Sequence, residues 1–188
     1  MRIAIIQGHP DAAARHFCHA LEAAYADAAR QAGHEVRAMD VAKLEVGPVR
    51  SKAEWEQAPM PAIREAQETM AWAGHLVVFF PLWLGCMPAL LKAFFEHALR
   101  PQFAGKTCSL SDRPLAGRSA RVIVTMGMPA LAFRWYFGAH GLRVLERNIL
   151  KFRGAGPVRA SLVGSVEGSP RRRDRWLARM RDLGGHAR

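Results

Sequence analysis

The segment His75-Leu-Val-Val-Phe-Phe-Pro-Leu-Trp-Leu-Gly-Cys-Met-Pro-Ala-Leu-Leu-Lys-Ala-Phe-Phe-Glu-His-Ala-Leu-Arg100 decides the fold of this chain. Residues 76–80 form a short apolar run of β-branched and aromatic residues that a proline ends, which predicts a strand buried on both faces. From Met87 to Leu99 the apolar residues recur with the helical period, which predicts an amphipathic helix. The stiff loop between them, residues 81–86, then lies at the carboxyl end of a central parallel strand, where open α/β sheets bind ligands.

The rest of the chain alternates strands with helices. Further strands are predicted at residues 2–7, 35–40, 121–126 and 156–163, and helices at 17–32, 61–73, 144–152 and 170–183. Residues 41–60 and 100–119 are predicted to be irregular. We therefore expect one domain over residues 1–188, with a parallel five-stranded sheet between two layers of helices.

Composition and charge narrow the function. Half of the 188 residues are apolar, yet no apolar run has membrane-spanning length, and the first strand begins at once, so we expect no signal peptide. Cys18, Cys86 and Cys108 lack metal-site spacing, so we expect reduced thiols in a cytoplasm and no metal. The net charge of +11 is concentrated in the arginines after residue 170, without a nucleic-acid motif. These arginines either form a solvated helix face or help to hold an anionic dinucleotide.

The first strand leads into a loop at residues 8–14, followed by a helix. Backbone N–H groups at such a helix start favour an anion. The sequence there, Gly8-His9-Pro10, is neither a dinucleotide fingerprint nor a Walker loop. His16 supplies a further hydrogen-bond donor near the helix start. His9 either contacts a phosphate or acts as a capping or surface histidine.

The segment Phe80-Pro-Leu-Trp-Leu-Gly-Cys-Met-Pro-Ala-Leu-Leu-Lys92 resembles the flavin-binding segment of the NAD(P)H:quinone oxidoreductase (DT-diaphorase-like) family. That family has a flavodoxin-like fold, so the resemblance, which covers about residues 2–182, implies the strand order 2-1-3-4-5. In the family this loop lies along the flavin ring, which implies contacts from Pro81, Leu82, Trp83, Leu84 and Gly85. The family usually has an aromatic residue where Leu84 stands.

The resemblance extends to other loops and implies further cofactor contacts. The first loop and helix start hold the flavin phosphate in this family, and the corresponding residues here are His9, His16, Phe17 and Cys18. The family's Thr-Thr-Gly-Gly turn, which faces the flavin pyrimidine edge, corresponds to Thr125, Met126, Gly127 and Met128.

Two positions bear on the adenosine half of FAD. Gln67 stands at the family's spacing for a glutamine that approaches adenosine, although it is equally readable as an exposed helix residue. FAD-binding members also place a basic residue at the start of the last helix, and Arg172 or Arg173 is the match, with Arg172 preferred. On this basis FAD is slightly favoured, and FMN is the alternative.

Gly138-Ala-His140 resembles the family's Gly-x-His, whose histidine lies near the flavin N1/O2 edge. This implies catalytic roles for His140 and Tyr136 in stabilising the reduced flavin, the alternative being a packed aromatic helix. The chemistry implied is two-electron transfer from NAD(P)H to a quinone or similar acceptor by a ping-pong mechanism, in a homodimer. Two other functions stay open: a regulatory flavoprotein subunit of a membrane transport system, and a flavodoxin-type electron carrier, against which the basic charge argues.

Overall fold

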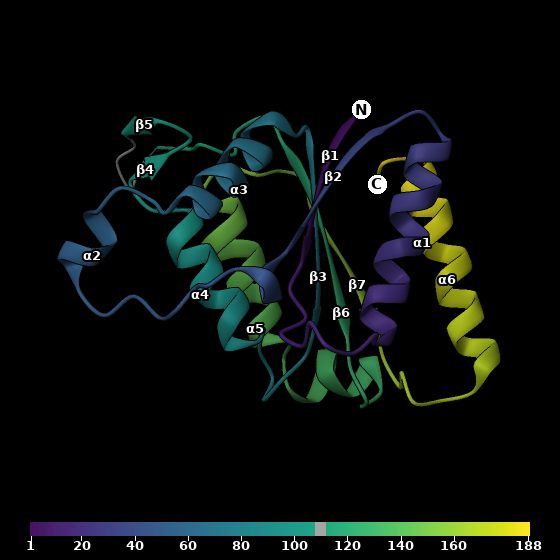
Figure 1. Ribbon diagram of the computed structural model, residues 1–188. Coiled ribbons are helices and arrows are strands. Elements are labelled where there is room, and N and C mark those ends of the chain that lie inside the picture. The colour runs from purple at the N-terminus through teal and green to yellow at the C-terminus, as the bar shows by residue number, and fades with distance from the viewer. Residues whose placement is uncertain (108–111) are drawn as a thin grey trace.

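The protein has three layers in a computed structural model that describes residues 1–107 and 112–188 (Figure 1). A central sheet separates two groups of helices. Helices α1 (Phe17–Gln31) and α6 (Pro170–Gly185) cover one face of the sheet. Helices α3 (Pro61–Trp72), α4 (Ala89–Ala98) and α5 (His140–Arg143) cover the other face.

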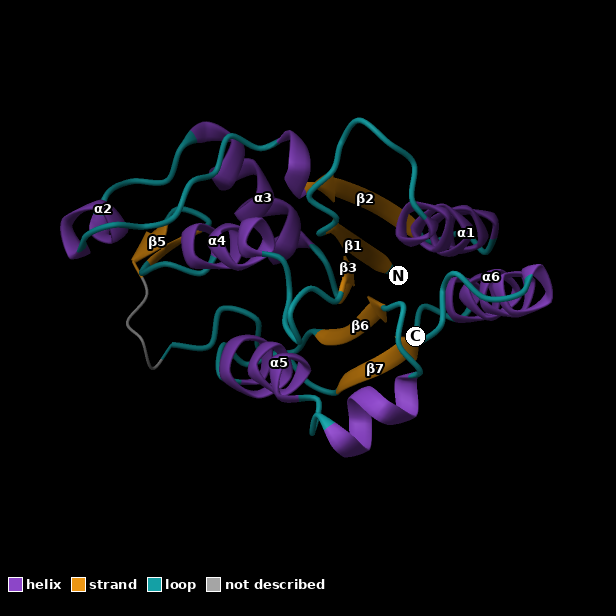
Figure 2. Ribbon diagram, turned by 90° about the horizontal axis from the view of Figure 1, so that it is seen from below, coloured by secondary structure: helices purple, strands orange, loops and turns teal. Residues whose placement is uncertain are grey.

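The sheet contains five parallel strands in the order β2-β1-β3-β6-β7. Their bounds are β1 (Arg2–Gln7), β2 (Glu35–Asp40), β3 (His75–Pro81), β6 (Ser119–Thr125) and β7 (Val158–Val163). These are the five predicted strands, and the predicted order 2-1-3-4-5 is confirmed. Because every strand runs in the same direction, all carboxyl ends lie at one edge of the sheet, seen from below in Figure 2.

The sheet is buried on both faces because alternate side chains enter the two helical layers. Ile6 and Val78 pack in the core cluster beneath α3 and α4, whereas Ile5 and Val77 pack beneath α1 and α6. The pair α1 and α6 approach very closely, since a Cβ at Gly184 would lie 2.2 Å from the carbonyl oxygen of Tyr25. The apolar run that predicts the central strand is therefore explained by burial on both sides.

Two segments predicted as irregular contain short elements. Residues 41–60 include the 3₁₀ turn η1 (Val41–Lys43) and the helix α2 (Lys52–Glu56). The hairpin of β4 (Gln102–Phe103) and β5 (Lys106–Thr107) lies within residues 100–119. Elements this short carry no detectable hydrophobic period, which is why the sequence does not predict them.

The segment after β6 contains two stretches with wide π-helical turns, η2 (Ala132–Tyr136) and η3 (Val144–Lys151), on either side of α5. Wide turns of this kind occur frequently at functional sites. Both chain ends lie at the opposite end of the sheet from the loops that follow β1, β3 and β6 (Figure 1). Among the helices of the described ranges, none is long and apolar enough to cross a membrane.

Two of the predicted free thiols can be described. Cys18 is buried and Cys86 is half-buried, and neither forms a disulfide. The third, Cys108, lies outside the described residues.

Candidate functional site

Three loops meet at the carboxyl edge of the sheet. The loops after β1 and β3 touch through His9 and Trp83, whose ring centroids lie 6.4 Å apart in an edge-to-face arrangement. The loop after β3 is tied to β6 by the Leu82 N–H, which donates to the Thr125 carbonyl at 2.7 Å. The structure therefore brings together the loops that the sequence predicts to form one site.

A fourth segment joins them from α5. A Cβ at Gly141 would lie 2.2 Å from the Gly85 carbonyl oxygen and 2.6 Å from the Cys86 Cα. Only glycine permits this approach between the two backbones. The contact places His140, the neighbouring residue, beside the loop predicted to carry the flavin ring.

The first loop uses much of its own hydrogen-bonding capacity. The Gly8 N–H donates to the Phe79 carbonyl at 2.7 Å, and the His9 N–H donates to Gln7 Oε1 at 3.1 Å. The His9 ring accepts the Asp11 N–H at Nδ1, 3.2 Å away, which leaves its proton on Nε2. The pKa of His9 is lowered to about 4, mainly by burial and in smaller part by the nearby His16 and His19. The ring is therefore neutral at pH 7.

Asp11 is a loop residue that the sequence reasoning did not single out. Its Oδ1 accepts the N–H groups of Ala13 and Ala14 at 2.8 and 3.3 Å, and its Oδ2 lies 2.8 Å from His16 Nε2. The hydrogen bond to His16 is the largest cause of a lowered Asp11 pKa. His16 in turn stacks on His9 with ring centroids 4.0 Å apart. The Asp11 carboxylate and the two imidazole rings therefore fix the conformation of this loop.

The start of α1 keeps two free donors. Within the described ranges, the backbone N–H groups of Phe17 and Cys18 have no hydrogen-bond partner, as is usual in a first helical turn. The Cys18 side chain points inward, with Sγ donating to Gln7 Oε1 at 3.4 Å, and burial raises the pKa of its thiol to about 12. Cys18 therefore offers a ligand its backbone N–H and not its thiol.

A cavity of about 790 Å³ opens beside this helix start. Its basic side chains come from the first loop, from η1 and from α6, through Arg15, Lys43 and Arg173 respectively. Asp40 also lines the cavity and pairs with Lys43 at 3.3 Å, which leaves Arg15 and Arg173 as the uncompensated charges. His16, Phe17 and His19 also line it. The cavity combines cationic side chains with free backbone donors, which suits an anion.

The loop after β3 makes a tight turn that projects into solvent. The backbones of Trp83 and Cys86 exchange two hydrogen bonds of 2.9 Å, and the two residues between them, Leu84 and Gly85, have φ values of +47° and +77°. A non-glycine residue in this left-handed region costs about 1–2 kcal/mol, and such strain persists only where the surroundings fix it. Leu84 is fully exposed and Trp83 is 52% exposed, so the turn presents apolar surface together with its free N–H groups.

The loop after β6 is held by the chain that follows β7. The Met126 N–H donates to the Val163 carbonyl, and the Ser165 and Val166 N–H groups donate to the carbonyls of Met128 and Met126. Met126 is therefore a structural residue: its side chain is buried and its N–H is occupied. Of the predicted contacts Thr125 to Met128, the N–H groups of Gly127 and Met128 remain accessible to a ligand.

His140 and Tyr136 lie on the exposed rim of the site. A Cβ at Gly138, which has φ +65°, would lie 2.6 Å from His140 Nε2, so the imidazole turns back over this glycine. Tyr136 is 85% exposed and touches Phe137 edge-on at 4.9 Å between ring centroids. The packed aromatic helix considered for these residues is not what forms.

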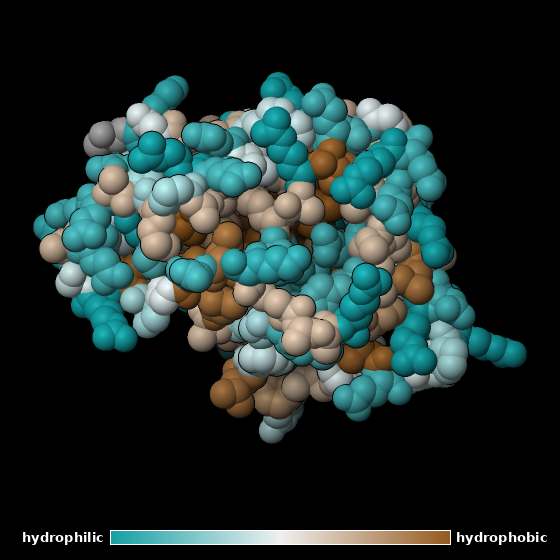
Figure 3. Space-filling view, in the orientation of Figure 1, coloured by the Kyte–Doolittle hydropathy of each residue, from teal (hydrophilic) through white to brown (hydrophobic). Residues whose placement is uncertain are grey.

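Instead, large apolar side chains gather at the surface around them. Four of these lie in and beside η2: Leu131, Trp135, Tyr136 and Phe137. Figure 3 shows apolar surface at the lower end of the molecule, where η2 and the loop after β3 lie. Large exposed apolar patches are typical of interaction sites.

Gln67 is not brought to this site. Its side chain is fully buried at the other end of α4, where Nε2 donates to the carbonyls of Ala98 and Gln102 and Oε1 accepts the Ala104 N–H. No donor remains for adenosine. Gln67 is therefore not an exposed helix residue: it is buried and fastens the β4–β5 hairpin to α3, and its contact with adenosine stays a prediction.

The two candidates for a basic contact to FAD at the start of α6 are separated in the structure. Arg173 lines the cavity beside the first loop, whereas Arg172 lines a different cavity with Trp176. Consecutive residues of an α-helix point about 100° apart, which sends the two guanidinium groups to different sides. Across the described ranges, no group of three or more His, Cys, Asp or Glu side chains is arranged to hold a metal ion.

Comparisons with known proteins agree with this architecture. Residues 1–183 match the family described as flavodoxin-like fold. The chain is 28% identical over 130 residues to rat NAD(P)H dehydrogenase [quinone] 1, a match that covers 65% of this chain and only 47% of that relative. This chain therefore corresponds to about half the length of that curated relative.

Two solved structures share the fold at low sequence identity. NAD(P)H:quinone oxidoreductase from Methanothermobacter marburgensis has a TM-score of 0.79 and 21% identity, with 98% of this chain and 96% of that chain covered. An FMN-dependent NADH-azoreductase from Bacillus anthracis str. Ames Ancestor, in complex with FMN, has a TM-score of 0.69 and 14% identity, with 98% of each chain covered.

Proposed function

Because this chain belongs to the flavodoxin-like fold family, we propose that it is a flavin-dependent NAD(P)H oxidoreductase that reduces a quinone or a similar acceptor. The observation that carries the proposal is the convergence of three loops, each with free backbone N–H groups, at one edge of the sheet. The names of the rat and archaeal relatives, both quinone oxidoreductases, support the same activity.

The residues present fit a flavin. The free N–H groups of Phe17 and Cys18 suit a phosphate, and His16, whose ring already pairs with Asp11, lies beside them. The exposed turn at Trp83 and Leu84 offers a flat apolar surface with backbone donors, which suits a ring that carries polar atoms along its edges. Gly127 leaves open space at its Cα, where the nearest atom to an added Cβ is Glu167 Oε1 at 4.0 Å.

A bound flavin would supply two-electron transfer between the nicotinamide and the acceptor. The chain's own part is to orient the ring and to stabilise negative charge that develops at its edge. The N–H groups of Gly127 and Met128, with His140, are the donors proposed for this purpose. Because one exposed rim serves both substrates, we propose that they bind in turn, as in a ping-pong mechanism.

The wide cavity beside the first loop supports FAD over FMN. A phosphate at the start of α1 leaves room for an adenosine half within about 790 Å³, and Arg15 and Arg173 supply positive charge there, whereas Lys43 pairs with Asp40. The FMN bound to the azoreductase shows that this fold also accepts the smaller cofactor in another protein. FAD therefore remains the proposal and FMN the alternative.

We also propose a homodimer that covers the exposed aromatic surface. Trp135 and Tyr136 are 77% and 85% exposed beside His140, and a second copy of the chain would bury them and narrow the site. Light scattering at micromolar concentration tests this, and a stable monomer would refute it.

The test of function is direct. The purified protein, reconstituted with FAD or FMN, should show oxidised-flavin absorbance. Under anaerobic conditions it should oxidise about one equivalent of NADPH or NADH per flavin without an acceptor, and should turn over continuously only when a quinone is added. Flavin binding without any NAD(P)H oxidation would instead favour an electron carrier or a regulatory subunit, and absence of flavin absorbance would reject the proposal.

A further inference from the structure

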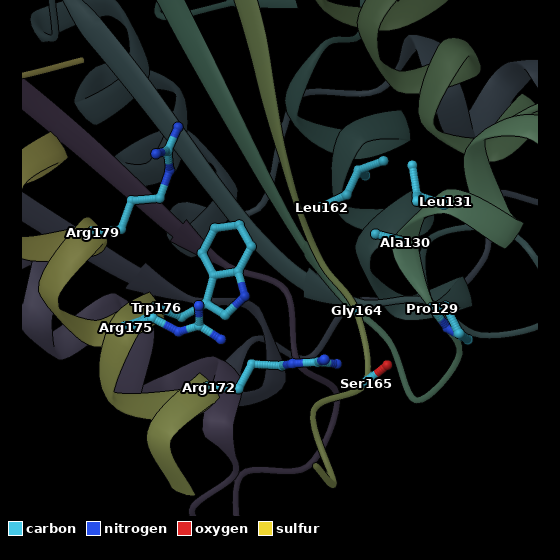
Figure 4. Close-up of a pocket in the computed structure, with 10 residues that line it drawn as sticks. All are labelled: Pro129, Ala130, Leu131, Leu162, Gly164, Ser165, Arg172, Arg175, Trp176 and Arg179. Carbon is cyan, nitrogen blue, oxygen red and sulfur yellow. The ribbon is translucent and has the colours of Figure 1, made fainter. Parts of the chain in front are cut away.

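A second cavity, of about 640 Å³, lies between α6 and the end of β7 (Figure 4). Its walls come from the segment after β6, the end of β7 and the following turn, and one side of α6. The lining residues are Pro129, Ala130, Leu131, Leu162, Gly164, Ser165, Arg172, Arg175, Trp176 and Arg179. A cavity of this volume is typical of small-molecule sites.

One wall carries three positive charges. Arg172, Arg175 and Arg179 follow each other at helical spacing, so all three guanidinium groups stand on the same side of α6. No Asp or Glu lines the cavity, and within the described ranges none of the three arginines forms an ion pair. Figure 4 shows Arg172 reaching from α6 toward Ser165. The wall is therefore complementary to an anion.

The opposite wall is apolar. It is formed by Pro129, Ala130, Leu131 and Leu162, and the Trp176 indole projects from α6 into the space facing it (Figure 4). The Arg179 Cζ lies 6.0 Å from the Trp176 ring centroid, so the indole already faces a cation. A ligand that matches both walls needs a flat apolar body and a negatively charged group.

We propose that this cavity binds an aromatic anion: a planar ring that bears a phosphate, sulfonate or carboxylate group. The ring would pack against Trp176 and Leu162, and the charged group would pair with Arg175 and Arg179, with Arg172 at the mouth. Guanidinium groups suit such anions because their forked donors match the oxygen geometry. Binding in this cavity does not depend on the proposed oxidoreductase activity.

The cavity is connected to the proposed flavin site by one short segment. The Ser165 N–H donates to the Met128 carbonyl at 3.0 Å, and a Cβ at Gly164 would lie only 2.3 Å from the Ala130 nitrogen. A ligand in this cavity would therefore contact the segment that also carries the N–H groups of Gly127 and Met128.

Isothermal titration calorimetry tests the inference with two probes, naphthalene-2-sulfonate and adenosine 2′,5′-bisphosphate, and with neutral 2-naphthol as the matched uncharged ligand. The key variant is Arg175→Ala/Arg179→Ala. The matched control is Arg171→Ala/Arg181→Ala, which removes the same charge from exposed positions of α6 that do not line the cavity. Every titration is repeated with saturating FMN.

At least one anionic probe should bind the wild type, and its affinity should fall about tenfold or more in the cavity variant but little in the control. Tighter binding of the nucleotide points to a nucleotide ligand, and tighter binding of the sulfonate points to an aromatic acid. A Trp176→Leu variant should weaken the same probe while retaining the wild-type melting temperature within a few degrees. Equal loss in the two arginine variants, displacement by FMN, binding of naphthol as tight as that of the sulfonate, or no binding at all would overturn the proposal.

Discussion

Gly141 and Gly85 are in backbone contact, although they are 56 positions apart in the sequence and neither belongs to a strand of the sheet. A Cβ at Gly141 would lie 2.2 Å from the Gly85 carbonyl oxygen, a distance that real structures do not show. This contact is what joins the segment after β6 to the turn after β3. The position of His140 relative to the exposed turn therefore depends on residue 141 being a glycine.

Gly141→Ala should separate these two segments. Relieving the overlap requires movement of backbone, so we expect a loss of about 1–3 kcal/mol in the free energy of unfolding and weaker flavin binding. Gly47→Ala is the matched control, because no atom lies within 4 Å of its added Cβ and its φ is not positive. Thermal melting and flavin titration check both variants, and a Gly141→Ala protein with wild-type values in both would contradict the contact.

Gln67→Ala should lower stability without affecting flavin binding. The substitution leaves the buried carbonyls of Ala98 and Gln102 and the Ala104 N–H without their partner. We expect a loss of about 2–3 kcal/mol in the free energy of unfolding, measured in urea. Glu68→Ala, an exposed position on the same helix, serves as the control. Selective loss of FAD affinity at unchanged stability would restore the adenosine contact that the sequence suggested.

The sequence predicts the sheet well because buried strands leave a visible pattern of apolar residues. Residues 76–80 must be apolar on both faces to lie between two helical layers, and that requirement is visible as an unbroken run. The shared edge of the first, third and fourth loops then follows from parallel strands alone. Loop residues such as Leu84 and Gly127 could be placed at the site by this topology without any knowledge of their side-chain contacts.

The direction of individual side chains could not be predicted in the same way. A spacing in sequence places Gln67 on α3 but does not say that its amide turns toward the backbone of the hairpin. Arg172 and Arg173 are adjacent in sequence and enter different cavities. Met126 stands in the predicted turn, yet β7 occupies its N–H. In each case the sequence leaves open which partner a polar group finds, because tertiary packing decides that.

Arg173→Ala should weaken FAD binding more than FMN binding. Arg173 lines the cavity beside the first loop, where an adenosine half would extend, whereas Arg172 lines the other cavity and provides a neighbouring control of equal charge. Apoprotein titrated with each flavin should lose about tenfold in FAD affinity in the Arg173 variant and little in the Arg172 variant. If the wild type binds both flavins equally and neither substitution changes this, the preference for FAD is wrong.

Acid should destabilise the protein through His75. Burial, assisted by Arg121, lowers the pKa of His75 from 6.5 to about 4, and its buried Nε2 has no hydrogen-bond partner in the part of the chain that the structure describes. Between these pH values the unfolded chain binds a proton that the folded chain does not, so the free energy of unfolding falls as the pH drops from about 6.5 toward 4. His75→Gln should flatten this decline. Urea midpoints of the two proteins at pH 7 and pH 5 provide the measurement, and parallel losses in both would exclude His75 as a cause.

His140→Ala should reduce turnover more than it reduces flavin binding. His140 starts α5, next to the glycine that packs on the turn after β3, and its imidazole is exposed on the rim of the site. A donor at this place would stabilise charge that forms only during reduction, so its loss should lower kcat by about tenfold to a thousandfold. Flavin affinity should stay within a few-fold of wild type, because the phosphate contacts are proposed to lie at the start of α1. His186→Ala, at the opposite end of the sheet, is the control for the loss of an exposed histidine. Steady-state rates with NADPH and a quinone, normalised to bound flavin, provide the readout. An unchanged kcat in His140→Ala would remove this residue from the mechanism, and an equal drop in the two variants would attribute the effect to something other than the position of His140.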